Sequence, residues 1–201
     1  MNFAPRGTYG AVAALSCLMT LNACGRPATA PAANDALGPT VLGTVPAALA
    51  QKICSPTGPE LCFNATDDNC NGIIDEGCGL HTGLVQFALA WDEPRADVDL
   101  RVFDPSGELV EVGRPARSGL VKERDCPGRN NECHGQNFEN VYLGDGEPAR
   151  GEYRARVRLE ALAGENPPIR VAFGARVGPK TYSATVSLEA PEAEQELIFR
   201  L

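Results

Sequence analysis

The side chains best suited to chemistry lie close together in residues 64–78, which read NATDDNCNGIIDEGC. Oxygen-bearing side chains alternate along this stretch, and Gly72 follows them where a calcium loop needs a sharp turn. A hard cation such as Ca²⁺ takes about six to eight oxygen ligands at about 2.3–2.6 Å, and alternate residues of a tight loop can all point inward. The spacing therefore predicts a calcium site, with the first isoleucine offering its backbone carbonyl. The predicted ligands are Asp67, Asn69, Asn71, Ile73, Asp75 and Glu76.

The order of these residues resembles the start of an EF-hand calcium loop, although position twelve is Cys78 and no helix-forming sequence flanks the loop. Residues 54–78 resemble more closely the short metal-binding-motif repeat of exported proteins in certain soil-dwelling Gram-negative bacteria, C-x7-C-x-N-G-x-D-[DN]-[DN]-C-[DN]-G-x-x-D-E-G-C. All four cysteines match, while Ala65 replaces the usual Gly. The resemblance implies a metal ion, and the neutral Asn ligands predict a Kd of roughly 10⁻⁴–10⁻³ M. The alternative is a knot of Asx turns held by disulfides without an ion.

A second pair of carboxylates, Asp97 and Asp99, lies in a segment with the alternation of a β-strand, so both share one face of that strand. Carboxylates held side by side repel each other unless a positive charge lies between them. One prediction is a second bound cation, completed by Glu139 or Asn140. The simpler alternative is Arg101, which lies on the same face.

The cysteines predict disulfides, because six of them follow the N-terminal region of a chain that is expected to be exported. Cys126 and Cys133 lie alone in one loop and are expected to pair. Zinc is disfavoured because it takes closely spaced pairs such as C-x2-C, and none occurs. The remaining four cysteines allow three pairings, which the sequence does not separate; they are Cys54, Cys62, Cys70 and Cys78.

The N-terminus has the features of an export signal. Arg6 gives a positive start, and residues 11–21 form an apolar run that is too short to cross a bilayer. The sequence LNAC that follows resembles the bacterial lipobox, which implies that Cys24 is lipidated and anchors the mature protein to a membrane. Gly25 stands where Asp would signal inner-membrane retention, so the resemblance implies the outer membrane, facing either the periplasm or the exterior. The alternative is cleavage nearby and secretion.

Composition divides the chain into four regions: a signal peptide (1–23), a flexible tether rich in Ala and Pro (24–50), a Cys-rich metal-binding segment (51–81) and a β-domain (82–201). The net charge is −8. An acidic surface argues against nucleic acid as a partner, because nucleic acid is bound by clustered Lys and Arg.

From residue 82 onward, apolar residues alternate as in β-strands, and no segment shows a sustained helical period. In residues 152–160, EYRARVRLE, the apolar side chains share one face and three arginines share the other, which favours a solvated face over a binding stripe. Trp91 lies on an apolar strand face and is predicted to belong to the core rather than to stack on a sugar. About seven to nine strands in about 120 residues predict an all-β fold, an antiparallel and jelly-roll-like β-sandwich.

Residues 89–113, LAWDEPRADVDLRVFDPSGELVEVG, resemble the opening of YfaP-like bacterial domains and, more distantly, of pre-peptidase C-terminal domains, which carry W-x(n)-D-V-D-L-x-V-x-D-P-x-G. Residues 135–157 resemble a second block of the same domains, although Asn137 and Phe138 replace the usual Gly and Pro. The resemblance covers most of residues 84–188 and implies a β-sandwich with a binding or accessory role. The matching residues of the second block are Glu139, Asn140, Gly151 and Tyr153.

No catalytic motif is evident in the sequence. Neither His81 nor His134 belongs to H-E-x-x-H, G-x-S-x-G does not occur, and every cysteine beyond Cys24 has an expected disulfide role. The sequence favours a lipid-anchored, non-catalytic binding or adhesion module, stabilised by disulfides and Ca²⁺, with a carbohydrate or a protein as ligand. The polar loop 124–137 is a candidate recognition surface. The alternative is a purely structural envelope protein that acts as a spacer.

Overall fold

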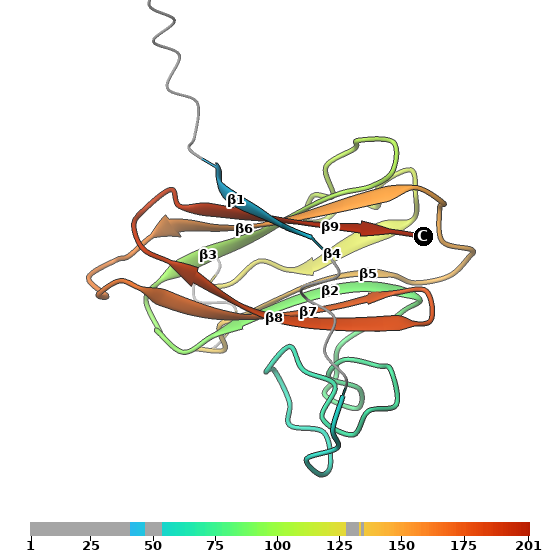
Figure 1. The fold of residues 1–201 in the computed structure, drawn as a ribbon, viewed down its shortest axis with the longest axis horizontal. Helices are drawn as coiled ribbons and strands as arrows, with labels where there is room; N and C mark the ends of the chain where they lie inside the picture. The colour runs from blue at the N-terminus through green and yellow to red at the C-terminus, as the bar shows by residue number, and fades with distance from the viewer. Residues whose placement is uncertain (1–40, 47–53, 128–132, 134) are drawn as a thin grey trace, which may run out of the picture. The chain divides into compact units, whose positions relative to one another are not determined.

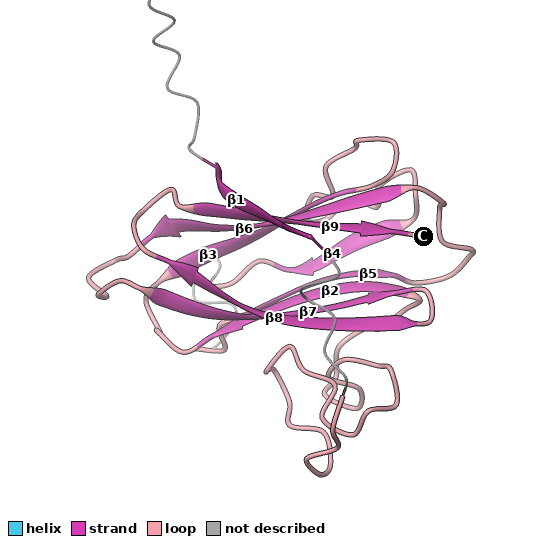
Figure 2. Ribbon diagram, viewed as in Figure 1, coloured by secondary structure: helices cyan, strands magenta, loops and turns pink. Residues whose placement is uncertain are grey.

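A computed structural model describes residues 41–46, 54–127, 133 and 135–201, and within these ranges the chain is all-β without a helix (Figure 2). The described strands are β1 (Val41–Pro46), β2 (Val85–Trp91), β3 (Asp97–Phe103), β4 (Leu120–Arg124), β5 (Phe138–Leu143), β6 (Glu152–Ala161), β7 (Ile169–Val177), β8 (Lys180–Leu188) and β9 (Glu194–Arg200).

The strands form two sheets that pack face to face (Figure 1). The strand order is β1-β9-β6-β3 in one sheet and β4-β5-β2-β7-β8 in the other. Neighbouring strands are antiparallel except β1 and β9, which are parallel. The predicted antiparallel β-sandwich is confirmed, and strands β2 to β9 make up this sandwich within residues 82–201.

The main core lies between the two sheets because alternate side chains point inward along each strand. On β6, Tyr153, Ala155, Val157 and Leu159 are buried and alternate with half-buried residues, as the sequence predicted. Trp91 is also buried, and its indole N–H donates a hydrogen bond to the carbonyl of Ala96 at 2.9 Å. The prediction that Trp91 is a core residue is therefore confirmed.

The arginine row on the other face of β6 is engaged by its neighbours. Arg156 pairs with Glu196 at 2.6 Å, and the guanidinium groups of Arg154 and Arg156 both lie over the ring of Phe103. These contacts occupy the charges that a binding stripe would offer to a ligand, so the row belongs to the architecture of the sheet.

The Cys-rich segment packs on the outer face of the five-stranded sheet. Gly174 on β7 permits this close approach, since a Cβ there would lie 2.3 Å from the carbonyl oxygen of Ala65. All seven residues of β2 are consequently buried, although the alternation in VQFALAW predicts one solvated face. The contact forms a second apolar cluster of Ala65, Ile74, Ala88, Ala90 and Phe138.

The tether prediction is wrong for residues 41–46, which form β1 and pair with β9. A strand added to a sheet edge is held by backbone hydrogen bonds, so its sequence need not alternate between apolar and polar residues. Valine also favours the extended conformation. The rest of the predicted tether, the signal peptide and Cys24 lie outside the described residues.

Candidate metal sites

The described residues form three disulfides, which indicate that the chain folds in an oxidising, extracytoplasmic compartment. The short loop disulfide is confirmed as predicted. Of the three pairings left open for the other cysteines, the structure has the interleaved one. The disulfides are Cys54–Cys70, Cys62–Cys78 and Cys126–Cys133.

In the predicted calcium loop, the side chains of Asn69, Asn71 and Glu76 are hydrogen-bonded to one another, and the Asp67 carboxylate is hydrogen-bonded to the loop backbone. Asp67 accepts hydrogen bonds from the backbone N–H groups of Asn71 at 3.1 Å and Gly72 at 2.9 Å. The side-chain amides of Asn69 and Asn71 both donate to Oε1 of Glu76, at 2.5 Å from Asn69. Glu76 therefore closes the loop against the side-chain amides of the two asparagines.

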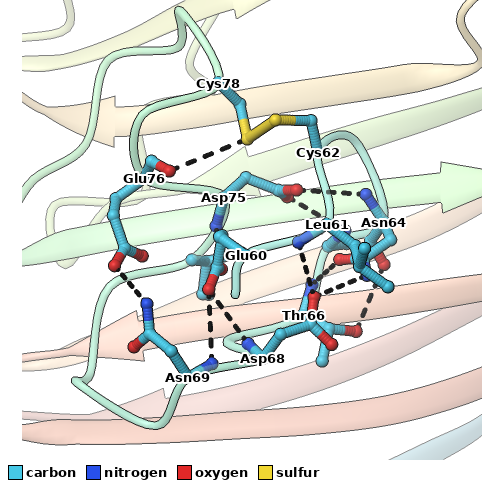
Figure 3. Close-up of a disulfide and its surroundings, with 12 residues drawn as sticks. Glu60, Leu61, Cys62, Asn64, Thr66, Asp68, Asn69, Asp75, Glu76 and Cys78 are labelled. Atoms are coloured by element: carbon cyan, nitrogen blue, oxygen red, sulfur yellow. Dashed lines mark hydrogen bonds between the residues drawn. A yellow bond between two sulfur atoms is a disulfide. The ribbon is translucent and has the colours of Figure 1, made fainter. Parts of the chain in front are cut away.

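Asp75 has a different role from the predicted one. Its carboxylate is fully buried and accepts hydrogen bonds from the backbone N–H groups of Asn64 at 3.1 Å and Ala65 at 3.0 Å (Figure 3). Burial raises the pKa of Asp75 to about 6, although these hydrogen bonds oppose the shift. Asp75 thus ties two parts of the segment together. Ile73 remains in the loop, where its N–H donates to the side-chain oxygen of Asn71 at 2.9 Å.

Glu60 is a residue that sequence reasoning missed. Its carboxylate accepts hydrogen bonds from the backbone N–H groups of Asp68, Asn69 and Asp75 at 3.2, 3.3 and 3.0 Å (Figure 3). Burial, and then repulsion from Glu76, raise the pKa of Glu60. The only signal in the sequence was that Glu60 is the single carboxylate between the first two cysteines of the segment.

Negative charge in this segment is not balanced from within. Residues 54–80 contain no Lys or Arg. Oε2 of Glu76 is buried and has no hydrogen-bond partner within the described chain. A buried carboxylate oxygen without a partner is costly, and a cation would satisfy it. The five carboxylates of residues 54–80 are Glu60, Asp67, Asp68, Asp75 and Glu76.

A recess of about 70 Å³ lies where the Cys-rich segment meets β8. A recess of this size suits one substituent of a ligand rather than a whole ligand. Asp67 belongs both to this recess and to the calcium loop. Its polar lining includes Thr57, Thr66, Asp67, Asp68, Thr181 and Ser183.

At the second predicted site, the structure brings together a different set of residues from the predicted one. Asp99 and Glu139 come together as predicted, but the third carboxylate is Asp125, and one oxygen of each lies within 4.8 Å of the others. Asp97 is outside this group of three, although burial and then repulsion from Asp125 raise the pKa of Asp97. Asp125 was missed because the order of the strands, which the sequence does not give, brings the end of β4 beside β3 and β5.

Asn140 points away from this group. On β5 the side chains alternate, so Glu139 faces the core side while Asn140 lies on the outer face, where its amide donates to the carbonyl of His81 and to Glu123, both at 2.8 Å. The positive charge beside the carboxylates also differs from the predicted Arg101. It is Lys122, whose ammonium contacts Glu139 at 3.0 Å.

Glu139 is the most buried member of the group. Burial raises the pKa of Glu139 well above its ordinary value, and the charge of Lys122 opposes this shift. Burial also raises the pKa of Asp99, to about 6, again with Lys122 in opposition. Burial alone would lower the pKa of Lys122, but the carboxylates of Glu139 and Asp125 outweigh burial and raise it.

His81 lies at the surface of the described chain. Nδ1 of His81 lies 2.7 Å from Glu123, and the His81 side chain is 69% exposed. His134 lies outside the described residues. No helix in the described ranges is long and apolar enough to cross a membrane.

Comparisons with protein-family models, with curated proteins and with solved structures found no match. The resemblances of residues 54–78 and of the sandwich to known families therefore stay predictions, and the function is inferred from the residues themselves.

Proposed function

We propose that this chain is an exported, non-catalytic binding module whose Cys-rich segment carries a structural Ca²⁺ ion. One observation carries the proposal: Asp67, Asn69, Asn71 and Glu76 lie in one disulfide-bonded and hydrogen-bonded loop, in a segment with five carboxylates and no Lys or Arg. Oxygen donors of this kind are the ligands that Ca²⁺ prefers. The ion would balance the carboxylates and give the buried oxygen of Glu76 a partner.

The recess beside β8 supports a binding role that depends on the ion. Asp67 lines the recess and also belongs to the loop, so an ion held by Asp67 would fix one wall of the recess. The surface of the recess is mainly apolar and carries a few hydroxyl groups, among them those of Thr181 and Ser183. It therefore suits a small substituent that has an apolar face and one hydrogen-bonding group, which a carbohydrate or a protein side chain can supply.

Attachment to the outer membrane through a lipid on Cys24 completes the proposal. It rests on the LNAC sequence and on Gly25, and the disulfides support export. Cells grown with labelled palmitate should incorporate label into the wild-type chain and not into Cys24→Ala. Label in the variant, or none in the wild type, would contradict the anchor and leave a secreted module.

The calcium proposal is tested by calorimetric titration of the oxidised full chain. We expect saturable Ca²⁺ binding with a Kd of roughly 10⁻⁴–10⁻³ M. Glu76→Gln should weaken binding at the loop at least about tenfold, because it removes the charged ligand that closes the loop. Asp92→Asn removes an exposed carboxylate elsewhere and is the matched control. Equal affinities in all three proteins would contradict the site.

The binding role is tested with an array of bacterial envelope glycans and with immobilised outer-membrane proteins. We expect saturable binding that is lost in Thr181→Arg, which would fill the recess. Thr185→Arg, on the exposed part of the same strand, should bind as the wild type does. If the wild type binds neither array, the binding role is refuted in favour of a structural spacer.

A further inference from the structure

We propose that Asp99, Asp125 and Glu139 form a second divalent-cation site, specific for a hard ion such as Ca²⁺, in which the Lys122 ammonium competes with the ion. This inference does not depend on the calcium loop, since it concerns other residues in the sandwich. The three carboxylates come from β3, from the end of β4 and from β5, so the fold rather than the local sequence brings them together.

The spacing of the oxygens fits an ion of this kind. One oxygen from each carboxylate lies within 4.8 Å of the other two. Two oxygens on opposite sides of a Ca²⁺ ion, each at about 2.4 Å, are about 4.8 Å apart. The three oxygens can therefore share one ion without a large movement of the strands, and water can complete the coordination because Asp125 is exposed.

Glu139 supplies an independent indication that a ligand belongs here. Its side chain is fully buried, Oε2 accepts the N–H of Leu100 at 2.6 Å, and Oε1 has no hydrogen-bond partner in the described parts of the chain. A buried carboxylate normally has all its lone pairs satisfied. When Glu139 is ionised, this oxygen can only accept, and a cation shared with Asp99 would satisfy it.

The local charge is not balanced by Lys122. Four carboxylates surround one ammonium group, which pairs with Glu139 at 3.0 Å and with Asp125 at 2.5 Å. Asp97 and Asp99 are the other two, and both interact with Lys122. When all four carboxylates are ionised, one ammonium group leaves an excess of three negative charges, which a divalent ion would reduce to one. For the ion to reach Glu139, the Lys122 side chain must move away from it.

Such an ion would act at the open edge of the sandwich. Glu139 on β5 already binds the free edge of β3 through the Leu100 N–H, so it links the two sheets. Asp125 directly precedes Cys126, which is buried and disulfide-bonded to Cys133. The ion would thus fix the two sheets and the start of this loop relative to one another.

The test uses Mn²⁺, which shares the preference for oxygen ligands and broadens nearby NMR signals. In the oxidised full chain, Mn²⁺ should broaden the amide signals of Leu100 and Lys122 with a saturable midpoint below about 10 mM, and excess Ca²⁺ should restore them. Asp125→Asn, a change at an exposed side chain, should abolish this broadening. The control Asp145→Asn, at another exposed carboxylate, should leave it unchanged.

Lys122→Met tests the competition. Methionine keeps the length of the buried side chain and removes its charge, so the ion should bind at least about tenfold more tightly. Broadening that persists in Asp125→Asn, or affinity unchanged in Lys122→Met, would overturn the proposal. Glu76→Gln should not alter these signals, whereas it weakens binding at the calcium loop, so failure at one site is distinguished from failure at the other.

Discussion

The Cys-rich segment and the sandwich lie against each other but are stabilised in different ways. The segment has two interleaved disulfides, carboxylates that accept backbone N–H groups, and only Ala65 and Ile74 as buried apolar residues. The sandwich has a large apolar core between two sheets. The comparison shows that disulfides and hydrogen-bonded carboxylates stabilise the segment, whereas apolar burial stabilises the sandwich.

The largest effect is expected from the sandwich core. Phe87 is fully buried, and its ring lies 5.5 Å from that of Phe199. Phe87→Ala should lower the free energy of unfolding by about 3–5 kcal/mol, because it removes apolar contacts and leaves a cavity. Thermal or denaturant unfolding measures the change. A loss below about 1 kcal/mol would contradict the view that apolar burial in the core is the main source of the sandwich's stability.

The second largest effect is expected from the disulfides of the segment. The double change Cys62→Ala and Cys78→Ala opens a loop that should contribute about 3 kcal/mol in the chain-entropy model. Hydrogen exchange should then become fast in residues 54–80 while β6 and β9 stay protected. The matched change at Cys126 and Cys133 opens a shorter loop and should leave the segment protected. If the sandwich unfolded together with the segment, the two regions would not be independent.

A smaller effect is expected where the two regions touch. Gly174→Ala places a methyl group 2.3 Å from the carbonyl oxygen of Ala65, so the segment must move outward. The expected cost is about 1–3 kcal/mol, with faster hydrogen exchange at Ala65 and Ile74. Ala172→Gly changes a neighbouring position on β7 without adding volume and serves as the control. Unchanged exchange in Gly174→Ala would contradict the close packing.

The smallest effects on stability are expected from substitutions at two adjacent carboxylates, Asp75 and Glu76, measured in the absence of Ca²⁺. Comparing the two variants separates a structural role from a ligand role. Asp75→Asn replaces one acceptor oxygen with a donor that faces backbone N–H groups, so it should destabilise the segment by about 1–3 kcal/mol. Glu76→Gln should cost less than about 0.5 kcal/mol, because its partners are side chains that can re-orient. Both losses are measured by denaturant unfolding. If Glu76→Gln cost more than Asp75→Asn, Glu76 would have the structural role and Asp75 would be the calcium ligand, as the sequence predicted.

Local patterns predicted much of the sandwich. The alternation of apolar and polar residues predicted which side chains of β6 point inward and that Trp91 is buried. The short sequence separation of Cys126 and Cys133 predicted their disulfide. The strand β1 was missed because a strand held at a sheet edge by its backbone leaves no periodic signal. Alternation along β2 did not reveal its second buried face, because that face is covered by a segment with no regular structure.

The sites were less predictable because their members meet through tertiary contacts. Spacing grouped Asp67, Asn69 and Asn71, which are close in the sequence and are linked through the backbone N–H of Asn71. Asp125 and Lys122 could not be assigned to the group around Asp99, since strand order decides which side chains become neighbours.

The most direct test of the calcium-loaded segment is a Ca²⁺ titration of the oxidised full chain, followed through the amide signals of Asn71 and Gly72 by NMR. Both N–H groups donate to Asp67, so they report on the loop itself. We predict saturable shifts with a midpoint of roughly 10⁻⁴–10⁻³ M that disappear in Asp67→Ala. Signals that do not move at about 10 mM Ca²⁺ would contradict the proposal and leave the loop as a disulfide-bonded knot of Asx turns.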